Sequence, residues 1–122
     1  MVKYNPNPCC IRASDCVVRA ICAATGEGWY KVYTELCVRG AALCDMPSVN
    51  RVWASYLKER GDSMKRIAGA CTVYDFAREH PDGIYILGTG THAVSVIDGD
   101  YYDAFDSGNE LVRYYFTLED GK

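Results

Sequence analysis

Cysteine and histidine are the residues of this chain whose spacing suggests nucleophilic chemistry. Cys16 follows Asp15 and opens an apolar stretch that is typical of a helix. In the first turn of a helix, exposed backbone N–H groups and the helix dipole lower the pKa of a thiol, so we expect Cys16 to be a nucleophile. Cys22 is expected in the core, and Arg19 on the surface or in an ion pair. The seven cysteines are at positions 9, 10, 16, 22, 37, 44 and 71.

The two histidines differ in their surroundings. His80 lies in a charged segment before Pro81, where a cation at the end of a helix explains it well. His92 follows the small residues of Gly88–Thr91 and begins an alternating apolar stretch that is typical of a strand. We therefore expect His92 to act as the base for Cys16.

A third residue is expected to orient the imidazole by accepting its Nδ1 proton. Asp98 and Gly99 predict a hairpin turn after the His92 strand. A loop that also includes Asp100 places His92 opposite Asp106, whereas a two-residue loop makes Asp103 the diagonal neighbour on the same face. Asp106 is the preferred third residue, because it ends its strand where a carboxylate can turn inward, and Asp103 is the alternative.

The elements that must position these residues follow from hydrophobic periodicity. Helical spacing and capping residues predict helices at 16–25, 29–39, 47–60 and 73–79. Short β-branched and aromatic runs predict strands at 83–87, 92–97, 101–105 and 111–117. We expect one α+β domain over residues 1–122, with a mainly helical part at 1–82 packed on an antiparallel sheet at 83–118.

The order of these features resembles the papain-like cysteine protease superfamily: a cysteine at a helix start, Gly-x-His at a strand start, then an aspartate after the next strand. Thr91–Glu110 is similar to the His-to-Asp hairpin of bacterial effector proteases and bacteriocin-leader peptidases of that superfamily. Asp15–Gly26 is similar to small phage and bacterial proteins. The resemblance implies a minimal papain-like fold and a Cys-His-Asp triad that cleaves a peptide or amide bond without a metal or organic cofactor.

The chain departs from the superfamily in one respect, since it contains no glutamine. The superfamily commonly places a glutamine a few residues before the nucleophile to complete the oxyanion hole, and that position is Cys10 here. The Cys16 backbone N–H could be joined by an amide from Asn7 or Asn5, or by the hydroxyl of Ser14. Without such a donor, we expect a slow enzyme or an inert relative that keeps the fold.

Composition excludes several other classes of function. The net charge of −3 leaves no basic stripe for nucleic acid, and no apolar run approaches the roughly 20 residues that a membrane span needs. The N-terminus has no apolar signal segment, so the expected location is the cytoplasm, with reduced thiols. Neither a Cys-x-x-Cys nor a His-x3-His pair occurs, so we expect neither a metal site nor a redox thiol protein.

Two functions from different classes remain. The first is a cysteine-nucleophile hydrolase, a peptidase or amidase whose substrate is a peptide or protein and which acts through an acyl-thioenzyme. The second is a catalytically inert papain-like binding protein, such as a phage-encoded modulator of a host protein. The small size and the missing glutamine favour the second; the Cys16, His92 and Asp106 set favours the first.

Overall fold

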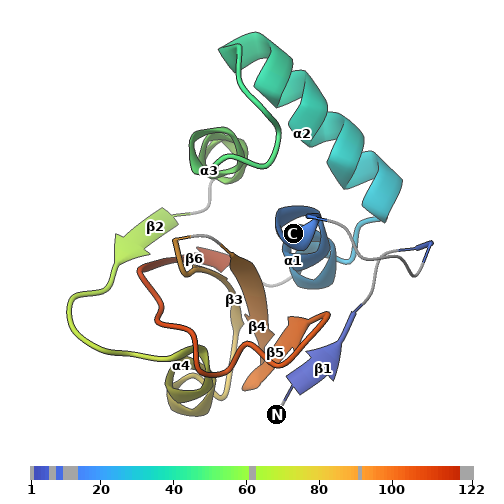
Figure 1. Ribbon diagram of the computed structural model, residues 1–122. Helices are drawn as coiled ribbons and strands as arrows, with labels where there is room; N and C mark the ends of the chain where they lie inside the picture. The colour runs from blue at the N-terminus through green and yellow to red at the C-terminus, as the bar shows by residue number, and fades with distance from the viewer. Residues whose placement is uncertain (1, 6–7, 10–13, 61–62, 91, 119–122) are drawn as a thin grey trace.

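A mixed β-sheet with helices on both faces forms the body of the computed structural model (Figure 1). The structure describes residues 2–5, 8–9, 14–60, 63–90 and 92–118. The helices within these ranges are α1 (Cys16–Thr25), α2 (Trp29–Leu43), α3 (Asn50–Glu59) and α4 (Val73–Glu79). The strands are β1 (Val2–Tyr4), β2 (Ser63–Arg66), β3 (Ile84–Gly88), β4 (Ala93–Ile97), β5 (Asp100–Asp103) and β6 (Tyr114–Leu118).

The strand order β1-β5-β4-β3-β6-β2 makes the sheet mixed. The pair β1–β5 is parallel, and the other neighbours are antiparallel. The predicted α+β class is confirmed, and so is the antiparallel pairing among the four strands β3, β4, β5 and β6. The expected purely antiparallel sheet is wrong, because β1 pairs in parallel with β5. The edge strands β1 and β2 also come from the part predicted to be mainly helical.

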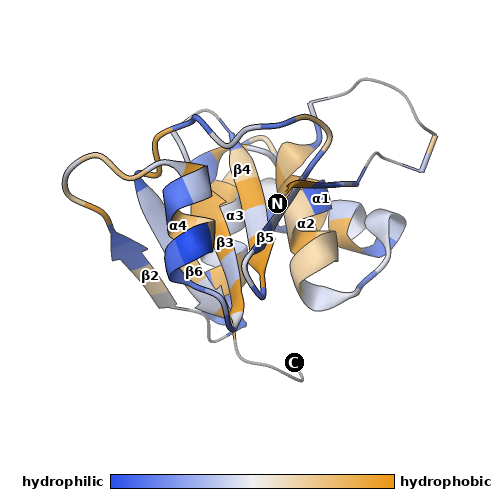
Figure 2. Ribbon diagram, turned by 90° about the horizontal axis from the view of Figure 1, so that it is seen from below, coloured by the Kyte–Doolittle hydropathy of each residue, from blue (hydrophilic) through white to orange (hydrophobic). Residues whose placement is uncertain are grey.

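Two hydrophobic cores, one on each face of the sheet, hold the layers together. Helices α1, α2 and α3 bury apolar side chains against one face, and α4 buries Val73, Phe76 and Ala77 against the other. Strands β3 and β4 lie between these layers and are hydrophobic, whereas the outer side of α4 is hydrophilic (Figure 2). Burial on both faces explains why these central strands read as nearly continuous apolar runs.

Local signals account for the helix ends that were predicted well. Helix α1 has its predicted bounds and ends at Gly26, whose φ of 76° is the left-handed conformation that glycine adopts at helix ends. Helix α4 also has its predicted bounds, and Thr72 and Asp75 form the predicted capping box. Helix α2 extends to Leu43, beyond the predicted end, and α3 begins at Asn50 instead of residue 47.

The turn between β4 and β5 contains two residues, Asp98 and Gly99, with φ of 49° and 86°. Left-handed conformations at both central residues are what a type I′ turn requires, and Asp-Gly supplies them. Backbone and side-chain hydrogen bonds between Asp98 and Gly83 hold the turn in place. Ile97 therefore pairs with Asp100, and the expected three-residue loop is wrong.

Helix α1 packs directly against β4. The buried small side chains of Ala20 and Ala24 on the helix and Ala93 on the strand share one core, which lets the two backbones approach closely. This packing sets the N-terminus of α1 beside the start of β4. The first residue of the helix is Cys16, the predicted nucleophile, and the residue before the strand is His92, the predicted base.

Candidate active site

Cys16 is the first residue of α1, and Asp15 is the N-cap residue. The thiol lies beside the His92 side chain and the backbone N–H of Ala93, and both groups lower its pKa. Both partners belong to the start of β4, on which α1 packs. The structure thus brings the predicted nucleophile and the predicted base into contact.

His92 contacts a carboxylate through its other ring nitrogen. Nε2 lies 2.5 Å from Oδ2 of Asp103, which leaves Nδ1 for the Cys16 thiol, the reverse of the predicted use of the two nitrogens. The His92 side chain is only 12% exposed, and its ring stacks on Phe105 with the centroids 5.0 Å apart. The imidazole is therefore fixed between a thiol, a carboxylate and an aromatic ring.

Asp103, the last residue of β5, has a fully buried side chain that accepts four hydrogen bonds. Oδ2 accepts from the Ser107 hydroxyl at 2.7 Å as well as from His92. Oδ1 accepts from the Ala104 N–H at 2.7 Å and from Nη1 of Arg19 at 3.2 Å. Four donors aimed at two oxygens favour the ionised carboxylate in this one orientation.

Asp106 does not occupy the position predicted for it. Its Oδ1 accepts from the Tyr101 hydroxyl at 2.6 Å and from the Gly108 N–H at 3.0 Å, so it stabilises the turn after β5. The two-residue turn shifts the hairpin register by one residue, and Asp103 becomes the partner of His92. The preference for Asp106 was therefore wrong. Asp103, the alternative given for a two-residue turn, occupies the position that was predicted for the third residue.

Arg19 is buried and connects two carboxylates, so a surface position is wrong and the expected ion pair is confirmed. Its Nε donates to Oδ1 of Asp15 at 2.8 Å, and its Nη1 donates to Asp103. Oδ2 of Asp15 accepts from Nε1 of Trp29 at 3.0 Å. The spacing of Asp15 and Arg19 by four residues indicates the first pair, and the apolar residues around Arg19 are the signal that it is buried.

These contacts shift the pKa of each member of the site. Burial would raise the pKa of the Cys16 thiol, but the hydrogen bonds from His92 and the Ala93 N–H lower it below its ordinary value. The positive charges of His92 and Arg19 act in the same direction. Burial would lower the pKa of His92, but Asp103 and Cys16 raise it to about 10. Burial would raise the pKa of Asp103, but the hydrogen bonds from His92, Ser107 and the Ala104 N–H, together with the charge of His92, lower it. The shifts favour a thiolate beside an imidazolium.

Cys16 and His92 open into a pocket with a volume of about 280 Å³. This is at the lower end of the size range of small-molecule sites, so it suits a short segment of a substrate and not a large ligand. The other residues that line the pocket are Val17, Ser48, Val49, Asn50, Trp53 and Gly90.

Of the expected side-chain oxyanion donors, neither of the two that the structure describes lines this pocket. Asn7 lies outside the described residues. Ser14 is exposed and does not line the pocket. Nδ2 of Asn5 donates to the backbone carbonyl of Arg19 at 3.3 Å, and Asn5 lines a separate cavity. The side-chain donor for an oxyanion must therefore be sought among residues that sequence reasoning did not consider.

Cys22 and His80 have contacts that indicate structural roles. No disulfide joins the cysteines that the structure describes. Cys22 packs against the core as predicted, and burial followed by the charges of Glu27 and Asp15 raises its pKa to about 11. Nδ1 of His80 lies 2.8 Å from the Phe76 carbonyl, and the two rings stack, which agrees with a helix-end role.

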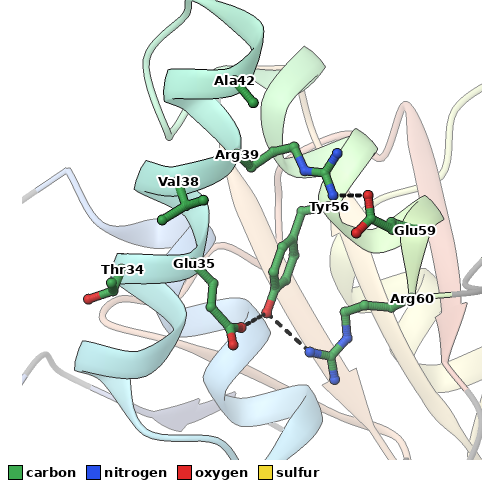
Figure 3. Close-up of a pocket in the computed structure, with 8 residues that line it drawn as sticks. All are labelled: Thr34, Glu35, Val38, Arg39, Ala42, Tyr56, Glu59 and Arg60. Carbon is green, nitrogen blue, oxygen red and sulfur yellow. Dashed lines mark hydrogen bonds and ion pairs between the residues drawn. The ribbon is translucent and has the colours of Figure 1, made fainter.

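A larger cavity, of about 590 Å³, lies between α2 and α3 (Figure 3). Arg39 is paired with Glu59 across it. The Tyr56 hydroxyl donates to Glu35 at 2.6 Å and accepts from Arg60 at 3.1 Å. The residues that line this cavity are Thr34, Glu35, Val38, Arg39, Ala42, Tyr56, Glu59 and Arg60. Its charged groups are all paired, Arg39 with Glu59, Arg60 with Glu27 and Glu35 with Lys31. No thiol or imidazole is among the described residues that line it.

No helix in the described part of the chain is both long enough and apolar enough to cross a membrane. Among the described residues, no group of three or more histidine, cysteine, aspartate or glutamate side chains is arranged to hold a metal ion. Comparison of the chain with protein-family models, curated proteins and solved structures finds no match.

Proposed function

We propose that the protein is a cysteine-nucleophile hydrolase, a papain-like peptidase or amidase, with Cys16, His92 and Asp103 as its triad. The observation that carries the proposal is that Cys16 and His92 line one pocket, with the thiol beside the imidazole, and that Nε2 of His92 contacts the buried Asp103. A nucleophile within reach of a base, which a third group orients, is the arrangement that activates a thiol. Asp103 takes the role that the sequence suggested for Asp106.

In the first half-reaction, the Cys16 thiolate attacks the carbonyl carbon of an amide. A C–S bond forms, and the π electron pair of the carbonyl moves to oxygen, which gives a tetrahedral oxyanion. When the carbonyl re-forms, the C–N bond breaks, and the leaving nitrogen takes the proton from the His92 imidazolium. The products are an amine, a thioester on Cys16 and a neutral imidazole.

In the second half-reaction, water attacks the thioester and gives its proton to His92. The C–S bond breaks, a carboxylic acid leaves, and the thiolate–imidazolium pair is restored. Asp103 stays ionised throughout and holds the Nε2–H, so that Nδ1 faces the reacting atoms.

The lining of the pocket favours a neutral segment of peptide as the substrate. Among the described residues that line the pocket, His92 is the only titratable base, and there is no carboxylate or lysine. The walls of Val17, Val49 and Trp53 are apolar, and Gly90 leaves space beside His92. The charges of Cys16 and His92 compensate each other, so a charged substrate group would lose hydration here without gaining an unpaired partner of opposite charge.

The test is site-resolved alkylation of the native protein with limiting iodoacetamide between about pH 5 and 9, read by mass spectrometry. We expect the pH midpoint of alkylation at Cys16 to lie within this range, whereas that of Cys22, on the same helix, should lie above it, near its pKa of about 11. His92→Ala is expected to move the Cys16 midpoint up to or above the value of an ordinary thiol, about 8.5. The midpoint is compared, because it does not depend on how accessible each thiol is.

His80→Ala is the matched control, since it removes the other histidine and is expected to leave the Cys16 midpoint in place. A Cys16 midpoint equal to that of Cys22, or one that does not respond to His92→Ala, would contradict the hydrolase. Such a result would favour the non-catalytic binding protein.

A further inference from the structure

The proposed reaction needs a donor for the carbonyl oxygen, because negative charge develops there when the thiolate attacks. Cys16 supplies one donor, since a first helical residue has no partner within the helix for its backbone N–H. A single donor leaves the oxyanion incompletely stabilised, and of the side chains predicted to help, the two that the structure describes, Asn5 and Ser14, do not line the pocket.

Asn50 lines the same pocket and belongs to a different helix from Cys16. It is the first residue of α3, and it is exposed, so a bound substrate can reach its side chain. Oδ1 of Asn50 accepts a hydrogen bond of 3.0 Å from Nε1 of Trp53. The Trp53 indole is only 1% exposed and packs against Tyr114 and Phe116, so it is a rigid anchor for the amide.

This hydrogen bond also fixes the orientation of the Asn50 side-chain amide. The indole nitrogen can only donate, so the oxygen of the amide must face it, and the NH₂ group must point away. Nδ2 makes no hydrogen bond to another residue in the described part of the chain. Asn50 therefore presents two unused N–H donors in a fixed orientation at the wall of the Cys16 pocket.

We propose that Nδ2 of Asn50 is the second oxyanion donor and replaces the glutamine that this chain lacks. The inference rests on the proposed hydrolase function. When the thiolate attacks, the electron pair that moves to the carbonyl oxygen is stabilised by the Cys16 N–H and by Nδ2 of Asn50. When the carbonyl re-forms, both hydrogen bonds weaken again, and Asn50 neither gains nor loses a proton.

The test compares two reactions of the same thiol. Acetylation of Cys16 by p-nitrophenyl acetate passes through an oxyanion, and the p-nitrophenolate leaves without needing a proton. Alkylation by iodoacetamide displaces iodide from a saturated carbon and forms no oxyanion. Loss of an oxyanion donor lowers the rate of acyl transfer about 10²- to 10³-fold, so the ratio of acetylation to alkylation should fall by about that factor.

Asn50→Asp is the first variant, since it keeps an acceptor oxygen for Trp53 and removes the NH₂ donor at nearly constant shape. Asn50→Ala is the second, and it removes the donor without adding charge. Asn109→Asp makes the same chemical change at an exposed position that does not line this pocket, and it should leave the ratio within about twofold of the parent chain.

The possible results separate the inference from the function on which it rests. A fall in the maximal acetylation rate with unchanged alkylation of Cys16 supports Asn50 as the donor. A ratio that does not change in either variant overturns it, as does a rise in the half-saturating ester concentration with no change in the maximal rate. If alkylation of Cys16 in the unmodified chain does not depend on His92, the hydrolase itself fails.

Discussion

Two networks of charged and polar side chains differ in where the fold places them. The α1–β5 network is almost completely inside the molecule, and its side chains are 12% exposed or less where they form ion pairs. The α2–α3 network lies in the larger cavity, where the side chains of Arg39 and Glu59 are 24% and 67% exposed. The α1–β5 network consists of Asp15, Cys16, Arg19, Trp29, His92 and Asp103, and the α2–α3 network of Glu35, Arg39, Tyr56, Glu59 and Arg60.

The comparison teaches that the chemistry of a site depends on what its charges do to one another and not on the size of the cavity. In the α2–α3 network, burial and the hydrogen bond to Glu35 raise the pKa of Tyr56, and the hydrogen bond from Tyr56 lowers the pKa of Glu35. Both groups therefore keep their ordinary protonation states at neutral pH. In the α1–β5 network, the same kinds of contact lower the pKa of the Cys16 thiol and so favour the thiolate.

The largest effect on stability is expected from Asp103→Asn. An NH₂ group at either position of the carboxylate would face donors, His92 and Ser107 on one side or Arg19 and Ala104 on the other. The buried Arg19 would also lose part of its compensating charge. Breaking a buried ion pair costs about 3–5 kcal/mol, so we expect the free energy of unfolding, measured by urea denaturation, to fall by about that amount.

Asp106→Asn is the control for that loss. The exposed Asp106 accepts hydrogen bonds from Tyr101 and Gly108 through one oxygen, and an asparagine oxygen can accept both. The urea midpoint should therefore stay near that of the unmodified chain. Equal losses for the two variants would mean that Asp103 is no more important to the site than a turn residue.

How much of this site could be predicted depended on how local each signal was. Cys16 and His92 were identified because each stands at the start of an element that its own neighbours predict. Only the number of residues in the turn between β4 and β5 decides whether Asp103 or Asp106 contacts His92. One more residue in that turn would move every side chain of β5 to the other face of the sheet. Asn50 was missed, since only the docking of α3 brings it to the pocket.

The elements of the fold, like the residues of the site, could be predicted where their signals were local. Glycine at the end of α1 and the capping box of α4 are local signals, and those two helices have their predicted bounds. Strands β1 and β2 have three and four residues and show no alternation that a sequence pattern could reveal. Strand β1 forms through its pairing with β5, almost a chain length away, and such long-range pairing cannot be inferred from neighbouring residues.

A smaller effect is expected from pH, through His92. Its pKa of about 10 in the folded chain lies above the ordinary value of about 6.5, so folding favours the protonated form. The stabilisation is fully present below about pH 6.5 and is lost as the pH rises through about 10. The lowered pKa of Cys16 acts in the opposite sense, and its stabilisation is lost as the pH falls through the pKa of the folded thiol.

The measurement is the difference in unfolding free energy between the unmodified chain and His92→Gln, from urea titrations between about pH 6 and 10. We expect a difference on the order of 2 kcal/mol near neutral pH, where the two charged forms coexist, that shrinks toward pH 10. A difference that stays constant with pH would show that His92 stabilises the fold by packing on Phe105 and not through its charge.

The smallest effect is expected in the α2–α3 network, from Glu59→Gln. The ion pair with Arg39 joins two side chains that water reaches, and exposed pairs contribute about 0–1 kcal/mol. The loss in unfolding free energy should be below about 1 kcal/mol and should diminish further in high salt, which screens exposed charges. The alkylation midpoint of Cys16 should not move, because Glu59 contacts no member of the α1–β5 network in the described residues. A loss as large as that of Asp103→Asn would remove the distinction between the networks, since it would make an exposed pair as strongly coupled to folding as a buried one.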